Sequence, residues 1–284
     1  MTKILSAYLS RLWKDKFFWL AMLFMAGFGV FLTLNQYNNQ QLLQQRGLVE
    51  TTDLALEQYC FFFQWVIGGV AALVSSLFLG LEYQDGTLRN KLIAGHSRTS
   101  VYLAGLIINL VSALALCFCY SFFSCVIGVP LMGGFQAETG TLLLLLAGNL
   151  LAVAAYCSLF TLIEMLTFSR TGAIVLTMLV FFGMLVLSTF LAGQLMKPEY
   201  ISIASGVDES GNLIFSQDLP NPSYLEGPLR TVFQTIVNLL PTGQAFSLAG
   251  GGDESLPLLP LYSLGLIALT TGLGIWGFRK KDII

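Results

Sequence analysis

The sequence predicts an all-α polytopic membrane protein with six transmembrane helices, and three observations carry this prediction. Hydrophobic residues make up 55% of the 284 residues and charged residues only 11%, whereas soluble domains carry about 25% charged residues. The apolar residues gather in runs about as long as the 20 residues that cross a bilayer. The basic residues cluster between alternate runs. We therefore expect one polytopic transmembrane domain over residues 1–284.

Six apolar runs are predicted to cross the membrane. They occupy about residues 17–34, 60–81, 99–129, 141–163, 172–192 and 258–278. The first run has no small-residue cleavage motif behind it, so we expect a retained span and not a signal peptide. The third run is long enough to tilt or to project beyond the lipid.

Residues 1–16 precede the first span and have two interpretations. Five apolar side chains fall on one helical stripe, namely Ile4, Leu5, Tyr8, Leu9 and Leu12. This stripe, with basic residues elsewhere, is typical of a helix that lies in the membrane interface. An ordinary basic flank that orients the first span would show the same charges.

The basic residues predict that both termini are cytoplasmic, because the positive-inside rule assigns Lys and Arg to that side. On the inner side are Lys3, Arg11, Lys14, Lys16, Arg89, Lys91, Arg98, Arg170, Arg279, Lys280 and Lys281. Only Arg46, Lys197 and Arg230 fall outside. Most acidic residues lie on the outer side and predict an acidic outer surface.

Residues 193–255 form the longest polar segment and are predicted to be extracellular. Within it, apolar residues recur at helical spacing over 229–240 until Pro241 stops the helix. A seventh crossing here would deliver the basic C-terminus to the outside. We therefore expect residues 229–249 to form an amphipathic or re-entrant element between the fifth and sixth spans, protected by neighbouring helices.

Residues 82–98, EYQDGTLRNKLIAGHSR, form a net-basic segment between the second and third spans. Asp85 can cap a short helix by accepting a hydrogen bond from the Leu88 N–H, and Gly95 can end it. The segment therefore predicts a two-turn amphipathic helix on the cytoplasmic side.

This short helix has an apolar side and a basic side. Leu88 and Leu92 stack at i,i+4 with Ile93 beside them, and would fill a groove on a soluble partner. The cations Arg89, Lys91 and Arg98 would set the register by charge, with Arg89 and Lys91 on the solvent side. The alternative is an ordinary basic cytoplasmic loop with a turn of helix.

The sequence lacks the motifs of an enzyme or a metalloprotein. There is no G-x-x-x-x-G-K-[ST] loop for ATP and no H-E-x-x-H, and His96 is the single histidine. We expect no catalytic residues, no metal and no cofactor bound by this chain. The five cysteines are expected to be small buried hydrophobes, although a Cys60–Cys125 disulfide is conceivable if their spans are adjacent.

The predicted spans are nearly free of ionisable residues, with Glu164 at a cytoplasmic edge. Ion-coupled carriers usually place such residues at mid-membrane. We therefore expect the energy for any transport to come from outside the chain.

The segment LGLEYQDGTLRNKLIAGHSRTSVYLAGL resembles the loop between the second and third spans of bacterial ABC type-2 transporter permeases, with their Glu-Tyr, Gly-Thr and Lys-x-Leu pattern and following Ser-Arg. The six-span layout is similar too. In that family the loop forms the coupling helix that docks on a separate ATP-binding subunit, which implies this role for residues 86–95. The implied docking residues are Glu82, Asp85, Gly86, Leu88, Arg89, Lys91, Leu92, Ile93 and Arg98.

Two further roles follow from the resemblance. Glu82 would relay motion between the spans and the ATPase, unless it is a solvated carboxylate paired with Arg89 or Arg98. The substrate path would run between the second and fifth spans of two facing permeases, identical or different. The implied lining residues are Phe61, Phe62, Phe63, Trp65, Thr177, Phe181 and Phe182.

Each lining residue has an alternative role in lipid contact or helix packing. An aromatic wall would suit an amphiphile or apolar peptide. Ala268 and Gly272 form a small-xxx-small pair in the sixth span. We expect them to pack tightly within the chain, and the alternative is that they form the seam between two permeases.

The resemblance implies the permease subunit of an ATP-driven ABC exporter in the bacterial cytoplasmic membrane. ATP and Mg would bind the partner ATPase, a second permease and membrane lipid would be the other partners, and the formal net charge of −2 suggests no nucleic acid. The alternative is a non-transporting sensor or scaffold that binds a peptide outside and recruits a cytoplasmic partner. An intramembrane enzyme would need polar in-membrane residues that the spans lack.

Overall fold

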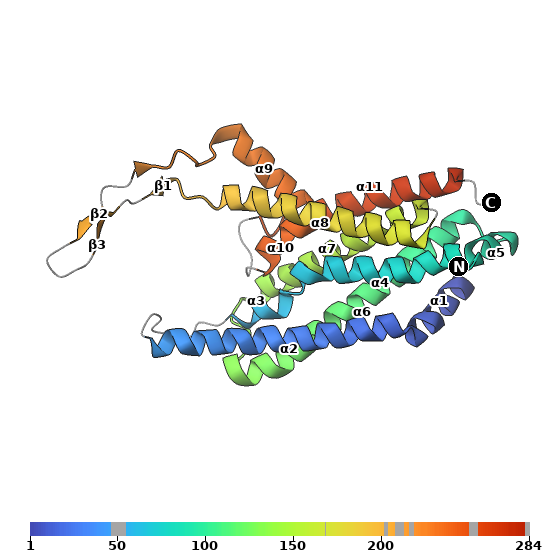
Figure 1. Cartoon of the computed structure of the whole chain (residues 1–284), viewed down its shortest axis with the longest axis horizontal. Helices are drawn as coiled ribbons and strands as arrows, with labels where there is room; N and C mark the ends of the chain where they lie inside the picture. The colour runs from blue at the N-terminus through green and yellow to red at the C-terminus, as the bar shows by residue number, and fades with distance from the viewer. Residues whose placement is uncertain are drawn as a thin grey trace.

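The computed structural model describes residues 1–46, 55–167, 169–201, 204–207, 213–215, 219–249 and 255–281. Helices run along one common direction and make up nearly all of this part of the chain (Figure 1). Six of the described helical segments are long and apolar enough to span a membrane. They are α2 (Lys16–Gln45), α3 with α4 (Leu56–Phe61 and Gln64–Gln84), α6 (Arg98–Met132), α7 (Thr139–Leu166), α8 (Arg170–Leu195) and α11 (Leu259–Lys280). The predicted all-α, six-span fold class is confirmed.

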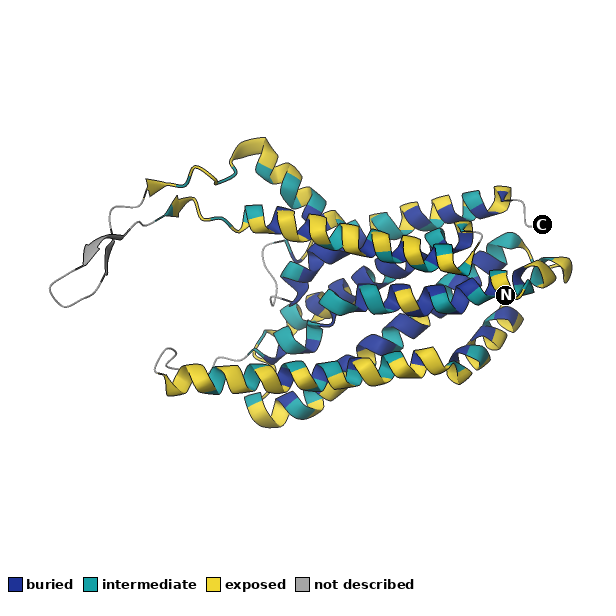
Figure 2. Ribbon diagram, viewed as in Figure 1, coloured by how far each residue is buried: buried dark blue, intermediate teal, exposed yellow. Residues whose placement is uncertain are grey.

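The spans divide into an inner and an outer set. Helices α4, α6 and α7 are the most buried, whereas α2, α8 and α11 expose most of their apolar side chains (Figure 2). Because exposed leucines and phenylalanines on the outer set would be unfavourable in water, lipid or another membrane protein must cover them.

Short polar residues begin the spans at one end of the bundle. The Asp15 carboxylate accepts from the Phe17 N–H at 2.8 Å at the start of α2. Ser97 begins α6 and Ser169 begins α8 in the same way. Such side chains satisfy N–H groups that have no partner within the first helical turn. At this end lie also α1 (Thr2–Lys14), α5 (Thr87–Ile93) and the C-terminus of α11 (Figure 1).

Two spans differ from their sequence-based bounds. Helix α2 continues to Gln45, about 45 Å at 1.5 Å per residue, so that its Gln/Asn-rich end extends past a hydrocarbon core of about 30 Å. Neither Gly nor Pro interrupts residues 30–46. The second span starts earlier than expected and is interrupted at Phe62 and Phe63, which separate α3 from α4.

The segment between α8 and α11 contains strands that the sequence analysis did not predict. The first pair is β1 (Tyr200–Ile201) with β4 (Leu219–Pro220), and the second is β2 (Ala204–Val207) with β3 (Leu213–Phe215), both antiparallel. Seven of the acids predicted for the outer surface lie outside the described residues, namely Glu50, Asp53, Asp208, Glu209, Asp218, Asp253 and Glu254.

The amphipathic element expected over 229–249 consists of two helices, α9 (Gly227–Leu239) and α10 (Pro241–Ala249). Helix α9 ends before Pro241 as predicted, with Leu240 in an extended conformation. Helix α10 is almost wholly buried and contacts α3, α4, α7 and α8 at the end of the bundle opposite α5 (Figure 1). The Gln244 amide secures it by donating to the Asn238 carbonyl at 2.8 Å and accepting from the Ser263 hydroxyl at 2.9 Å.

The expected packing of Ala268 and Gly272 within the chain is wrong. Both residues are exposed, and a Cβ at Gly272 would meet no atom within 4 Å. Gly274 makes the close contact instead, because a Cβ there would overlap the ring of Tyr102 on α6. The small residue at the helix contact therefore lies two positions further along α11.

Candidate functional site

Helix α5 is bounded by two glycines. Gly86 precedes it with φ of 63°, and no side chain caps its N-terminus, so the predicted Asp85 cap is wrong. Gly95 follows it with φ of 84°, as predicted. The Gly95 N–H donates to the Leu92 carbonyl at 3.0 Å, and the His96 N–H donates to the Lys91 carbonyl at 3.2 Å. These two hydrogen bonds form a Schellman motif, in which the positive φ favours glycine.

The apolar residues of α5 face in different directions. Leu88 is only 1% exposed and belongs to the main core of this chain, and Leu92 packs partly against that core. Leu88 therefore does not fill a groove on a partner, and this prediction is wrong. Ile93 is 74% exposed, and Arg89 is exposed as well. We call Arg89, Asn90, Ile93 and Ala94 the outer face of α5.

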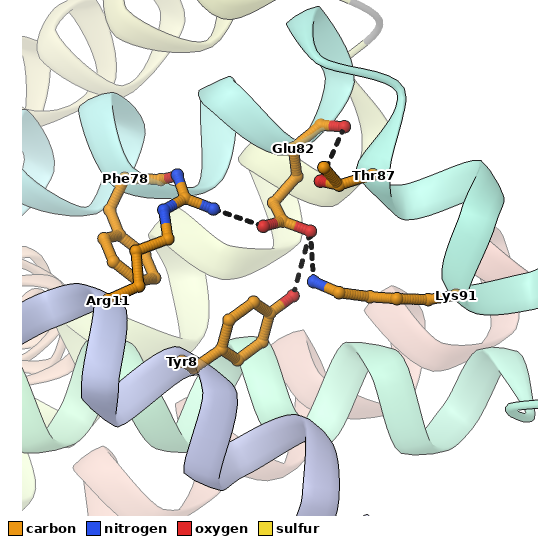
Figure 3. Close-up of polar contacts among 6 residues, drawn as sticks. All are labelled: Tyr8, Arg11, Phe78, Glu82, Thr87 and Lys91. Atoms are coloured by element: carbon orange, nitrogen blue, oxygen red, sulfur yellow. Dashed lines mark hydrogen bonds and ion pairs between the residues drawn. The ribbon is translucent and has the colours of Figure 1, made fainter.

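Glu82, at the end of α4, is the centre of a polar cluster that joins three helices (Figure 3). Its carboxylate is almost completely buried and forms ion pairs with Arg11 of α1 and with Lys91 of α5. The Tyr8 hydroxyl also donates to it, at 3.4 Å. We call Tyr8, Arg11, Glu82 and Lys91 the Glu82 cluster.

Aromatic rings surround the charges of the Glu82 cluster. The Arg11 guanidinium lies 4.5 Å from the centre of the Phe78 ring and donates to the Phe78 carbonyl at 2.7 Å. The Lys91 ammonium lies 3.9 Å from the centre of the Tyr8 ring. Both cations are thus held by a carboxylate and a π face together.

The cluster corrects two predictions. Glu82 is not a solvated carboxylate, and its cations are Arg11 and Lys91 in place of Arg89 or Arg98. Lys91 does not lie on the solvent side of α5. Burial lowers the pKa of Lys91, and Glu82 opposes that effect by stabilising the charged form. Burial raises the pKa of Tyr8, which therefore remains a hydrogen-bond donor.

A second set of contacts holds the C-terminal end of α11 beside this cluster. Arg98 donates to carbonyl oxygens there, including that of Arg279 at 3.0 Å. The Lys281 ammonium donates to the Tyr83 hydroxyl and to the Met165 carbonyl, each at 3.0 Å. Burial lowers the pKa of Lys281 to about 8. Arg98, expected at the partner interface, therefore contacts its own chain.

Glu164 is a buried polar centre that the sequence analysis placed at a cytoplasmic edge. Because α7 continues to Leu166, the Glu164 side chain lies inside the bundle and is only 1% exposed. It accepts from Ser75 at 2.5 Å, from Ser76 at 2.9 Å and from the Asn109 amide at 3.0 Å. No cation pairs with it within the described part of the chain.

This network joins four helices, because Ser76 also bonds Thr177 of α8 at 2.9 Å. The signal that could have revealed it was the presence of Ser75, Ser76 and Asn109 inside otherwise apolar runs. Such residues need hydrogen-bond partners in a bilayer and therefore point toward one another. Elsewhere, no cluster of His, Cys, Asp and Glu among the residues described could hold a metal ion.

An apolar groove of about 730 Å³ lies between α2, α4 and α8. Three residues of the expected substrate path line it, namely Trp65, Phe181 and Phe182. The wall contributed by α2 was not predicted and contains Phe17, Leu20, Ala21 and Phe24.

The other four residues of the expected path do not line this groove. Phe63 and Thr177 are buried within the bundle, where Phe63 packs against Tyr120 and Thr177 bonds Ser76. Phe61 and Phe62 lie around the interruption between α3 and α4. Phe63 and Thr177 could line a path only in a conformation that exposes them, whereas Phe61 and Phe62 are already partly exposed.

The chain is similar to one known protein family over much of its length. The family described as ABC-2 family transporter protein matches residues 9–192, which is more than half of the chain. The match covers the Glu82 cluster except Tyr8, the whole of α5, the Glu164 network and the groove. No individual curated protein matches the chain.

Proposed function

Because the chain belongs to the ABC-2 transporter family and is thus a multi-pass membrane permease component of an ABC transporter, we propose that it serves an exporter driven by a separate ATPase. Permeases of this family in general work as dimers with an ABC ATPase. The observation that carries the proposal is the placement of α5, which presents an open outer face while its inner face is attached to the bundle.

We assign the outer face of α5 to the ATPase contact. Exposed Ile93 would enter an apolar depression on the partner, and Arg89 would pair with an acidic group beside it. Leu88 and the Lys91–Glu82 pair anchor the same helix to the core and to α4. A displacement of α5 by the partner would therefore move the end of α4 instead of bending a free loop.

The Glu82 cluster would extend that movement to α1, since Arg11 and Lys91 share one carboxylate. The end of the bundle that carries α5 and both chain ends is rich in Lys and Arg, which supports a cytoplasmic location under the positive-inside rule. The membrane would then be the bacterial cytoplasmic membrane, with α9 and α10 at its outer side.

The groove between α2, α4 and α8 supports an amphiphilic or apolar peptide substrate. Its lining residues include aromatic rings and aliphatic side chains and no charged group. A sugar would leave its hydroxyl groups unpaired against such a wall, whereas an acyl chain or apolar side chain would not. We propose that a second permease closes the groove into a path, and that ATP and Mg act at the partner ATPase.

The test is purification of the tagged permease in mild detergent from its native membrane, with an Arg89→Glu/Ile93→Glu variant beside the wild type. We expect a Walker-motif ATPase to accompany the wild type and to be lost from the variant. The matched control is Arg89→Lys/Ile93→Leu, which keeps the charge and the apolar contact and should retain the ATPase.

Equal recovery of the ATPase with both double variants would disprove docking through this face. If the wild type remains dimeric but brings down no ATPase, the transport proposal fails. The sensor or scaffold function would then be the one to pursue.

A further inference from the structure

Two cysteines meet at the end of the bundle opposite α5. Cys60 on α3 and Cys125 on α6 place their sulfur atoms 3.1 Å apart. Both are free thiols, Cys60 buried and Cys125 partly exposed. Their separation exceeds the bonded distance of about 2.05 Å by only about 1 Å.

The backbones that carry these thiols are held together by other contacts. The Ser121 hydroxyl donates to the Cys60 carbonyl at 2.8 Å, and the Tyr120 hydroxyl donates to the Tyr59 carbonyl at 3.1 Å. A Cβ at Gly128 would overlap the Leu56 side chain, so α3 and α6 approach closely there. The sulfur atoms are therefore neighbours because the two helices are fixed against each other.

The other cysteines differ from this pair. Cys119 donates to the Met22 carbonyl at 3.5 Å, and Cys157 donates to the Asn109 carbonyl at 3.6 Å, so each uses its thiol within the helical bundle. Cys117 is almost fully buried. Cys60 and Cys125 alone combine mutual contact with a partly exposed sulfur at a bundle end.

We propose that Cys60 and Cys125 form an intrachain disulfide on the outer side of the membrane. The partly exposed Cys125 thiolate attacks the disulfide of a protein oxidant of the thiol–disulfide exchange class and forms a mixed disulfide. Cys60 then loses its proton, attacks the Cys125 sulfur and releases the oxidant as a dithiol. The permease loses two protons and two electrons, which the oxidant receives.

This inference uses the proposed orientation of the chain, because disulfides persist in oxidising compartments and not in the cytosol. The disulfide would link α3 to α6 through two cysteines that are 65 positions apart in the sequence. The α-helix is interrupted at Phe62 and Phe63, and α4 begins directly after them at Gln64. The disulfide would therefore fix the end of α3 that leads into Trp65, a residue of α4 that lines the groove.

The test counts free thiols in native membranes. Cells are quenched with acid, and the denatured chain is alkylated with a maleimide polymer either directly or after reduction. From the five cysteines, the wild type should gain three adducts directly and five after reduction. Cys60→Ser should gain four in both cases, because its partner is left unpaired. Cys119→Ser, the matched control, should gain two and then four.

Five adducts on the wild type without reduction would overturn the proposal. So would a disulfide that appears only after a chemical oxidant is added, since that shows proximity alone. Orientation is tested separately with an Arg89→Cys variant in a cysteine-free chain and a membrane-impermeant maleimide. Labelling of Arg89→Cys in intact cells would refute the proposed orientation. If Arg89→Cys is labelled only after permeabilisation and the wild type has five free thiols, the orientation stands and only the disulfide is refuted.

Discussion

Glu82 shows how one buried carboxylate can connect three helices. Its two oxygen atoms are divided between Arg11 and Lys91, and Tyr8 supplies a further donor. Both cations retain some contact with solvent, with side chains 31% and 19% exposed, so water weakens these pairs relative to fully enclosed ones. Losing the carboxylate would nevertheless leave two neighbouring positive charges without their shared partner.

We therefore expect Glu82→Gln to lower the free energy of unfolding by about 2 kcal/mol, within the range for hydrogen bonds to charged groups. The same change should reduce stimulation of the partner ATPase by substrate, because α5 would no longer be tied to α4. Thermal unfolding in detergent and ATPase assays check the two effects.

Asp85→Asn is the matched control for Glu82→Gln, since Asp85 is exposed, lies three residues after Glu82, and its side chain does not cap α5. It should melt like the wild type. Equal melting temperatures for the two variants would contradict the structural role assigned to Glu82.

At the scale of helices, small residues decide how closely α11 approaches α6. Gly274 and Gly272 lie on the same helix, yet only the first faces a neighbour, the buried ring of Tyr102. Both glycines have the same intrinsic helix propensity, but only Gly274 lacks room for a side chain. The same substitution at the two positions therefore separates the steric cost of an added Cβ from its effect on backbone entropy.

Gly274→Ala should destabilise the protein by about 1–3 kcal/mol, the usual cost of an extra group in a packed core. Gly272→Ala should leave stability unchanged or raise it by up to about 1 kcal/mol, because Ala favours the helix and meets open space. Thermal melting of both variants in one detergent gives the comparison. A destabilised Gly272→Ala would show that the outward face of α11 packs against a second subunit.

The whole molecule has an inner set of spans and an outer set that exposes apolar surface. The groove lies between them, where α2 and α8 flank α4. Phe182 stands at this groove and is 56% exposed, while Leu269 near the middle of α11 is 61% exposed and away from the groove. If the groove carries an amphiphile, these two exposed apolar residues should affect transport differently.

We expect Phe182→Ser to raise the KM for export about fivefold to tenfold, which corresponds to about 1–1.4 kcal/mol of lost aromatic contact. Leu269→Ser should leave the KM unchanged. Export in proteoliposomes that contain the permease and its ATPase provides the measurement. Equal KM values for the two variants would show that the substrate does not contact this groove.

Several parts of the fold and of the site follow from local sequence. The six apolar runs predict the spans, because lipid selects segments by length and hydropathy alone. Gly95 predicts the end of α5, because a positive φ next to a short helix favours glycine. The interruption at Phe62 and the strands after α8 had no such local signal.

The number of spans, the position of α5 and the basic end of the bundle can therefore be read from the amino-acid sequence. The inward direction of Leu88, the pairing of Glu82 with Arg11 and the contact of Glu164 with Ser75 are known only from the folded chain. Hydropathy and helix-ending signals belong to one segment and can be read from it. Burial and pairing depend on which distant segments meet, here 71 positions apart for Arg11 and Glu82, and no single segment contains that information.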